Sequence, residues 1–262
     1  RNVGRARPLF VKVGGEGQDA RMDALPLLHT LTAAFERDAV QTPLDTKPTA
    51  MKRWSAADLI AHLGAVHRWA AQNARSTTRN HRDNVPAITV PPAEYYAESR
   101  SILLDTLDEL DPNQRCYTFQ SGNKVVRFWH RRQTHETLVH LWDLRSAVDP
   151  EARAPAEADP DAYADGIEEL FSVFVARAGP AARTPLAGSL GLRAADIDRR
   201  WLLHPDWRFV PDAPETATTE VTGTAGDLML LGWDRLGPAS GRFEIEGEPG
   251  VLETFLRSRV RP

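Results

Sequence analysis

Cysteine and long hydrophobic runs are the features that this sequence most clearly lacks. Its 262 residues include one cysteine, Cys116, which excludes an internal disulfide framework and a zinc site built from cysteine ligands. Cys116 has no obvious partner, so we expect a buried structural thiol. The longest apolar runs, such as residues 228–231, fall far below the roughly 18 residues that span a bilayer. No charged segment followed by an apolar one opens the sequence, so we predict a cytoplasmic protein without a secretory signal or a membrane partner.

A surplus of basic residues is also missing. The 32 Lys and Arg residues are outnumbered by 36 Asp and Glu residues, and the formal net charge is −4. A general nucleic-acid-binding protein needs a basic surface, so this balance argues against a nucleic-acid partner. Hydrophobic residues make up 42% of the sequence, which is enough to build a core, and the length suits one large domain or two.

The hydrophobic pattern divides the chain into four regions. Residues 1–21 stand apart as an extension, and residues 22–150 repeat their apolar positions with the period of a helix. Residues 151–183 predict a linker and a connecting helix, and residues 184–262 mix short strand-like and helical segments. We therefore predict an α+β protein that is mainly α, with an N-terminal helical bundle and a small C-terminal α+β domain.

Local signals indicate where several elements begin. Ser55 and Asp58 have the spacing of a capping box, so a helix should begin near Ala56, and Asp58 needs no further role. Asp159 followed by Pro160 predicts the start of another helix. Further helices are expected from about Leu25 to Phe35 and at about 93–110, 127–147, 225–236 and 250–259, and strands at 190–192, 200–204, 208–210, 219–223 and 242–246.

A glycine-rich pattern near the start of the chain has a simpler interpretation than nucleotide binding. Gly15, Gly17 and Ala20 match G-x-G-x-x-A, which cradles a pyrophosphate when it joins a strand to a helix. No second strand follows in the next thirty or so residues, so the required unit is missing. We interpret this segment as a mobile extension.

The candidate chemistry lies on the fourth helix of the predicted bundle. His135 and His140 are five residues apart, about 140° around a helix, and cannot share a face. Glu136 and His140 are four apart and do share one, with Asp143 and Arg132 on the same side. A carboxylate and an imidazole on adjacent turns suit a metal such as zinc, but a third ligand must come from another helix.

His62 on the second helix is the best candidate for that third ligand. It lies within the apolar arc of Leu59, Leu63 and Val66, so it should point into the bundle, where facing helices assemble metal sites. His67 lies further round the arc. A His/Glu/His set would leave positions open for water or substrate, as catalytic zinc does. Such a metal would lower the pKa of a bound thiol or water, or polarise a carbonyl.

Two simpler interpretations compete with a metal site. Glu136, His140, Asp143 and Arg132 could form the solvent face of an amphipathic helix, since apolar residues lie opposite them. His62 could be a hydrogen-bonded core histidine. The residue pattern alone leaves these alternatives open.

Three segments favour the metal site over these simpler interpretations, because they resemble segments of a known family. Residues 54–69, WSAADLIAHLGAVHRW, and residues 131–143, RRQTHETLVHLWD, form two helical signatures. Residues 221–228, VTGTAGDL, are followed by Trp233 and Arg235. Together they resemble the mycothiol-dependent maleylpyruvate isomerase family, and the resemblance extends over most of the chain. It implies that the N-terminal bundle is a DinB-like four-helix bundle, followed by the family's C-terminal domain.

The resemblance also implies a set of site residues and cofactors. In the family a divalent metal, usually zinc, is held by one histidine of the second helix and by the Glu and His of the fourth, which fall here on His62, Glu136 and His140. Mycothiol, the low-molecular-weight thiol of actinobacteria, is the implied cofactor or co-substrate. Arg235 is the nearest match to an arginine that binds substrate or thiol, and Asp143 is expected to support the metal ligands during catalysis.

The implied activity is addition of a metal-activated thiolate to a small electrophilic molecule. If the adduct is kept, the enzyme is a thiol S-transferase, and if it collapses after bond rotation, the enzyme is an isomerase. The family often has Cys-Pro-Gly-Trp before the second helix, whereas only Trp54 remains here, which favours the transferase. The alternatives are a metal-dependent hydrolase that uses bound water and a non-catalytic binding or regulatory module. The expected assembly is a monomer or a homodimer.

Overall fold

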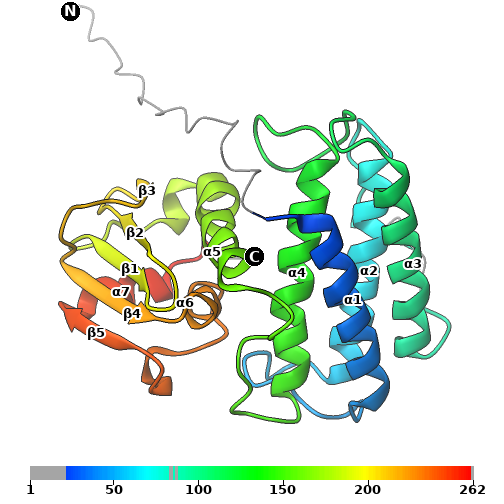
Figure 1. Ribbon diagram of the computed structural model, residues 1–262, viewed down its shortest axis with the longest axis horizontal. Coiled ribbons are helices and arrows are strands. Elements are labelled where there is room, and N and C mark those ends of the chain that lie inside the picture. The colour runs from blue at the N-terminus through cyan, green and yellow to red at the C-terminus, as the bar shows by residue number, and fades with distance from the viewer. Residues whose placement is uncertain (1–21, 83–84, 86–87, 261–262) are drawn as a thin grey trace, which may run out of the picture.

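The computed structural model describes residues 22–82, 85 and 88–260. The predicted extension, residues 1–21, and its glycine-rich pattern lie outside the described residues. A helical bundle and an α+β region lie side by side (Figure 1). None of the helices in the described part of the chain combines the length and the apolar character needed to cross a membrane.

The bundle consists of four long helices. They are α1 (Ala24–Gln41), α2 (Ala56–Ala74), α3 (Pro92–Glu109) and α4 (Arg127–Ser146). Helices α1 and α2 each pack against both α3 and α4. The start of α2 is the predicted capping box, because the Ser55 Oγ accepts from the backbone N–H of Asp58 at 3.2 Å and the Asp58 Oδ2 accepts from that of Ser55 at 2.8 Å.

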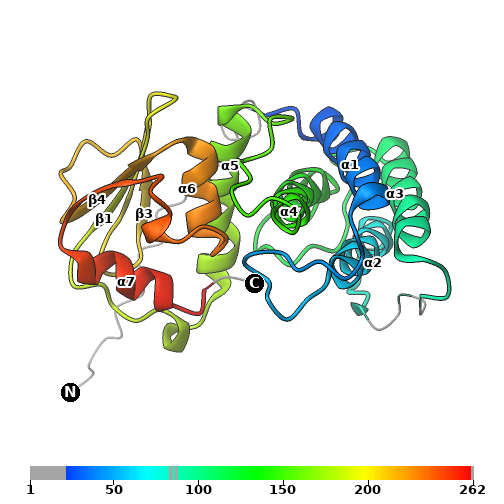
Figure 2. The same cartoon turned by 90° about the horizontal axis from the view of Figure 1, so that it is seen from below.

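Helix α4 is buried on almost every side. Figure 2 shows it between the other bundle helices and helix α5 (Pro160–Glu169), which begins the second half of the molecule. Arg132 is 3% exposed and Asp143 is fully buried. The alternative of a solvent-exposed face is therefore wrong. The polar side of α4 is covered by α5, to which Arg131 Nε donates a hydrogen bond at Asp165 Oδ2, 2.7 Å away.

Helix α5 begins where the sequence predicts and then changes its geometry. The side chain of Asp159 accepts a hydrogen bond from the backbone N–H of Ala162 at 2.8 Å, which confirms the predicted N-cap. The helix continues directly as a π-helix over Leu170–Val175. The backbone hydrogen bonds of a π-helix link residues five apart rather than four, so each hydrogen-bonded turn holds one residue more than an α-turn. Within it, Phe174 packs against Trp233 with ring centroids 5.1 Å apart.

The second half of the chain contains a five-stranded sheet. Its strands are β1 (Leu190–Ala194), β2 (Arg199–Leu203), β3 (Phe209–Pro211), β4 (Thr219–Gly223) and β5 (Glu244–Gly247). The order is β3-β2-β1-β4-β5, with β1 parallel to β4 and the other pairs antiparallel. Leu192 of β1 is paired with Trp201 on one side and Val221 on the other, and all three are buried. The predicted α+β, mainly helical fold class is confirmed.

Further helices pack against the sheet. They are α6 (Ala225–Gly232) and α7 (Pro249–Arg257), with short 3-10 helices at Pro180–Ala182 and Pro238–Ser240. Helix α6 packs against α5 and against β1 and β4. Buried apolar side chains of both halves form one contact cluster, which runs from Phe35 in α1 to Phe255 in α7. The two halves therefore share a core.

The predicted helix 225–236 is too long at its C-terminal end. Helix α6 stops at Gly232, and Asp234 adopts a left-handed backbone conformation with φ of 62°. The backbone N–H groups of Arg235 and Leu236 both turn back to the carbonyl of Leu230, at 2.8 and 3.2 Å. The apolar spacing that includes Leu236 continues the helical pattern past this turn, and the predicted C-terminal end of the helix is wrong for that reason. The turn directs Arg235 towards α4.

Candidate metal centre

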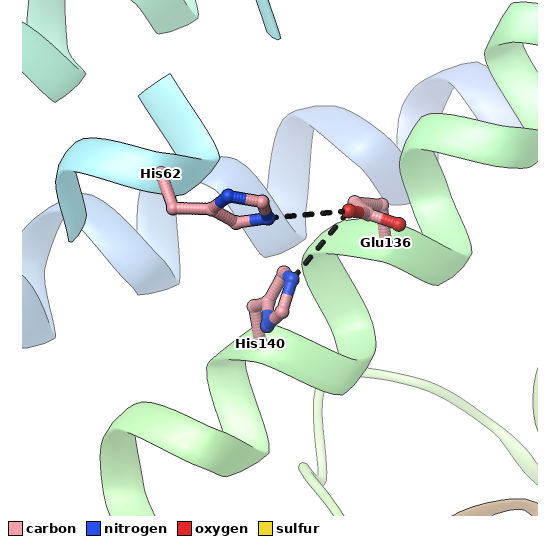
Figure 3. Close-up of side chains that lie close together, drawn as sticks. All are labelled: His62, Glu136 and His140. Carbon is pink, nitrogen blue, oxygen red and sulfur yellow. Dashed lines mark ion pairs between the residues drawn. The ribbon is translucent and has the colours of Figure 1, made fainter. Parts of the chain in front are cut away.

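Three side chains from two helices converge on one point. His62 comes from α2, and Glu136 and His140 come from successive turns of α4 (Figure 3). Glu136 Oε1 lies 3.5 Å from His140 Nε2 and 3.9 Å from His62 Nε2. The three candidate ligand atoms all lie within 4.8 Å of one another, and no other such group of three occurs among the described residues.

Helix geometry explains which histidines join this group. His140 lies one turn after Glu136 and faces the same way, whereas His135 faces α5, where its Nε2 lies 2.7 Å from Asp165 Oδ2. His67 is fully buried deeper between α2 and α4, and its Nε2 bonds the Thr137 hydroxyl at 3.2 Å. The five-residue spacing therefore separates the histidines of α4 as expected, and His67 serves the core.

A carboxylate fixes the orientation of His140. Asp143 Oδ2 lies 2.9 Å from His140 Nδ1, which leaves Nε2 to face Glu136. Asp143 is fully buried and accepts from Arg235, whose Nε and Nη2 lie 3.2 and 3.1 Å from Oδ2. Metal-binding histidines in proteins are oriented in this way by a carboxylate on their second nitrogen. Asp143 and Arg235, both selected from the sequence, therefore lie behind His140.

Arg132 holds the other α4 residue of the group. Its guanidinium bonds Glu136 Oε2 through one nitrogen and Glu169 Oε2 of α5 through another. It also lies over the rings of both Phe174 and Trp233, with its central carbon 5.1 and 5.0 Å from their centroids. Sequence reasoning placed Arg132 on the correct face of α4 but missed Glu169, because no local pattern connects it to the site.

The electrostatics keep His62 neutral and Glu136 ionised near neutral pH. Burial lowers the pKa of His62 to about 4, and the adjacent His140 acts in the same direction. Burial alone would raise the pKa of Glu136, but Arg132, His140 and His62 together hold it well below its usual value. Burial likewise opposes the charged form of His140, yet its bonds to Asp143 and Glu136 raise its pKa. His62 and Glu136 are therefore in the forms that bind a metal, whereas His140 must give up the proton that these bonds favour.

The donor set fits a divalent metal. Imidazole nitrogen and carboxylate oxygen are both zinc ligands at about 2.0–2.2 Å, which places tetrahedral ligand atoms roughly 3.4 Å apart. The two distances to Glu136 Oε1 are close to that spacing, and the second nitrogen of His140 is already engaged by Asp143. Three protein ligands from two helices leave one side of the group open.

That open side faces a cavity of about 250 Å³ between the bundle and the second half of the chain. Residues from both halves line it, including His62 and Gln133 of the bundle and Phe174, Trp233 and Arg235 beyond it. A larger, open depression of about 1010 Å³ lies against the sheet, where Arg193, Arg200 and Glu220 help to line it, and it includes neither the His/Glu/His group nor its partners Arg132, Asp143 and Arg235. The cavity beside the His/Glu/His group is therefore where a small molecule can reach these side chains.

Cys116 takes no part in this site. It is 3% exposed and packs in an apolar cluster beneath Trp129. Burial raises the pKa of its thiol to about 11. The prediction of a buried structural thiol is confirmed.

The arrangement defines a class of protein: a DinB-like bundle with a His/Glu/His cluster, closed on one side by a small α+β domain. Residues 25–145 match the family model of the mycothiol maleylpyruvate isomerase N-terminal domain, and residues 161–254 match that of the MDMPI C-terminal domain. The chain belongs to the mycothiol-dependent maleylpyruvate isomerase family. The family predicted from the sequence is thereby confirmed.

Solved structures show the same fold. A crystal structure of the mycothiol-dependent maleylpyruvate isomerase is 18% identical, covers 87% of this chain and 94% of its own, and gives a TM-score of 0.57. A histidine-to-alanine mutant of the mycothiol-dependent maleylpyruvate isomerase is 17% identical over the same shares, with a TM-score of 0.59. A search of curated proteins found no match.

Proposed function

We propose that this protein is a mycothiol-dependent enzyme of the maleylpyruvate isomerase type, in which a divalent metal activates the thiol for addition to a small electrophilic molecule. The observation that carries this proposal is the convergence of His62, Glu136 and His140 on one wall of a partly enclosed cavity. Family membership supports an enzyme, an isomerase and a thiol cofactor. Because free low-molecular-weight thiols persist in reducing compartments, the cytoplasm is the proposed location.

His62, Glu136 and His140 would hold the metal, with zinc the best match to the donors. When bound, such a metal deprotonates a coordinating thiol, so that the sulfur reacts as a thiolate at neutral pH. The remaining residues act on the ligands. Asp143 keeps Nε2 of His140 turned towards the site, and Arg132 fixes the second oxygen of Glu136.

Arg235 connects the second half of the chain to the site. It reaches Asp143 from the turn after α6 and also lines the cavity, where its side chain is 15% exposed. We assign to it the positioning of Asp143 and a positively charged wall for the substrate or thiol. A carboxylate or enolate oxygen that develops charge near this wall would be stabilised.

The reaction follows from the shared first step. The thiolate sulfur forms a bond to an electrophilic carbon of a carbon–carbon double bond that is conjugated with a carbonyl. The π electron pair of that double bond moves towards the carbonyl oxygen, which gives an enolate. In an isomerase, the new single bond rotates, the double bond re-forms and the sulfur leaves with its electron pair, so the thiol is regenerated. In a transferase, the adduct instead takes up the proton that the thiol released and keeps its carbon–sulfur bond.

Zinc content and thiol response test the proposal together. Purified protein should contain about one zinc per chain, and its Tm should rise when mycothiol is added. His140→Ala and Glu136→Gln should lose the metal, the thiol response and thiol-dependent turnover. The matched control is His29→Ala, an exposed histidine of α1 that bonds Asp108 at the surface, and it should retain all three.

The controls also separate the other interpretations. Turnover by the zinc-loaded protein with no thiol present would favour a hydrolase that uses bound water. Zinc binding without turnover of any electrophile would favour a binding or regulatory module. A protein that binds neither metal nor mycothiol would overturn the proposal.

A further inference from the structure

Gln133 is a buried residue whose amide oxygen lacks a partner. It lies one turn before Glu136 and two turns before His140 on the same face of α4, and it lines the cavity. The residue is 1% exposed, and its Oε1 accepts no hydrogen bond from any residue that the structure describes. Buried polar atoms are paired in the great majority of cases. Other described side chains, such as Gln72, also hold an unpaired buried atom, but Gln133 alone among them lines the cavity, which makes its amide the candidate to contact a ligand there.

The cavity runs along the groove between α2 and α4. Trp69 lies two turns after His62 on α2, or about 10 Å along the helix axis, and it lines the same cavity. Its ring contacts Trp129, one turn before Gln133 on α4, with centroids 5.2 Å apart. Trp69 and Gln133 therefore lie at the same end of the cavity, and the metal centre lies at the other.

Aromatic rings form the walls at the Gln133 end. Trp69 and Phe119 lie nearly parallel, with centroids 6.2 Å apart and an interplanar angle of 14°. Phe174, which the π-helix brings to the cavity, lies 6.1 Å from Phe119. Flat apolar walls of this kind favour a ring by offset stacking and by apolar burial.

The charges at the cavity argue against a small dianion at this end. Two of the three arginines in the described lining are ion-paired, Arg132 with Glu136 and Glu169 and Arg235 with Asp143. The third, Arg82, is exposed and lies over the ring of Trp69, with its central carbon 5.0 Å from the centroid. A dicarboxylate would need buried unpaired cations, whereas an uncharged ring needs apolar walls and one polar contact.

A second hollow leaves room for the thiol. It has a volume of about 460 Å³, opens to the surface, and shares Trp54 and His62 with the 250 Å³ cavity. Arg53 and Asp58 lie in its wall. Because it is more open and carries the charges of Arg53 and Asp58 beside its apolar side chains, it suits a hydrophilic thiol, while the more enclosed cavity suits an apolar molecule. Of the His/Glu/His group, His62 lines both hollows, whereas Glu136 and His140 line the 250 Å³ cavity.

We propose that the Gln133 end of the cavity is an acceptor subsite that takes an aromatic ring carrying one hydrogen-bonding substituent, and that the Gln133 amide selects that substituent. This inference rests on the proposed function only in that the acceptor would meet the thiol at the metal centre. Binding to the subsite requires neither thiol nor turnover.

Binding of two unreactive probes to the full-length protein tests the subsite. 4-Nitrobenzyl alcohol and 4-nitrotoluene differ by one hydroxyl, and both nitroaromatic rings should quench tryptophan fluorescence when they bind beside Trp69, Trp54 and Trp233 of the cavity wall. The alcohol should bind about tenfold more tightly to the unmodified protein. Gln133→Leu should remove that difference by weakening the alcohol about tenfold and leaving the toluene unchanged. The matched control is Gln72→Leu, since Gln72 of α2 also has an unpaired amide oxygen but does not line the cavity.

Several results would overturn the subsite. These are failure of both probes to bind, an equal effect of Gln133→Leu on alcohol and toluene, or displacement of the aryl probes by equimolar maleate. The same titrations on zinc-loaded and metal-stripped protein separate the two proposals. If the aryl probes bind with the expected selectivity but no zinc or thiol dependence is found, the proposed function fails and the subsite stands.

Discussion

Arg235 donates hydrogen bonds to the buried carboxylate of Asp143, which lies 92 residues earlier in the chain, and Asp143 in turn contacts Nδ1 of His140. The turn that ends α6 is thereby tied to a candidate metal ligand. A substitution in the second half of the chain should therefore alter the position of His140 in the bundle.

Replacing Arg235 tests this connection. Arg235→Ala leaves the charge of Asp143 buried without its cation, so we expect the free energy of unfolding to fall by about 2–4 kcal/mol. Zinc affinity should fall by about 10-fold or more, because His140 loses part of its support. Urea unfolding and competitive zinc titration measure the two effects. Arg257→Ala is the control, since that side chain is 72% exposed, and it should cost less than about 0.5 kcal/mol. Equal effects of the two variants would contradict the connection.

Chelation should destabilise the protein through the same site. A ligand that binds only the folded state contributes about 2.7 kcal/mol at 100 times its Kd. Scanning calorimetry with excess zinc and then with EDTA should show a higher Tm in zinc that falls on chelation. His62→Ala, which lacks one donor, should show little difference between the two conditions. A Tm of the unmodified protein that does not respond to zinc would count against a metal at this position.

Stability should depend on pH through His67. Burial lowers the pKa of this residue to about 3, against an ordinary value of about 6.5. Because the folded pKa is the lower one, the unfolded chain binds the proton more readily between these values. Stability is therefore complete above about pH 6.5 and declines as the pH falls towards 3, by up to about 1.4 kcal/mol per unit.

Urea unfolding of metal-free protein between pH 4 and 8 measures this decline. His67→Gln keeps a polar group near Thr137 but removes the titration, so its profile should be flatter over this range. The exposed His81, changed to Gln, should leave the profile as it is. If the unmodified protein and His67→Gln lose stability in parallel as the pH falls, the contribution of His67 is absent.

Cys116 should not react with disulfide reagents while the protein is folded. Burial and the raised pKa of Cys116 keep the thiol protonated at neutral pH, so a disulfide reagent should modify it only after unfolding. Cys116→Ala should retain turnover that depends on added thiol. Loss of turnover with an unchanged zinc content would mean that the reactive sulfur belongs to the chain itself.

Much of the fold follows from local rules that the sequence displays openly. Ser55 with Asp58, and Asp159 with Pro160, are capping signals that act within a few residues, so the starts of α2 and α5 could be predicted. Glu136 and His140 could be paired for the same reason, because four residues return a helix to the same face. His62 required only the assumption that its apolar neighbours face the bundle.

The contributions of other elements could not be predicted in this way. From the sequence alone, the polar side of α4 looks like a solvent-exposed face. Its partners, Glu169 and Trp233, are distant in the sequence, so no local pattern shows that they cover it. Gln133 carries no signal of its own, since a glutamine on a polar face is ordinary until its surroundings are known. Leu236 fits the helical spacing, but the left-handed backbone of Asp234 breaks the helix two residues earlier, and the spacing does not reveal that break.

The π-helix at Leu170–Val175 lets the loss of a single residue change the shape of the cavity, which a substitution at one position does not do. Removing one residue from the turn would restore the ordinary helical register and rotate everything after it by about 100° relative to α5. Phe174 would then leave the cavity and no longer cover Arg132. Members of this fold that differ in length by a single residue at this point should accept differently shaped molecules even if their metal-binding side chains are the same.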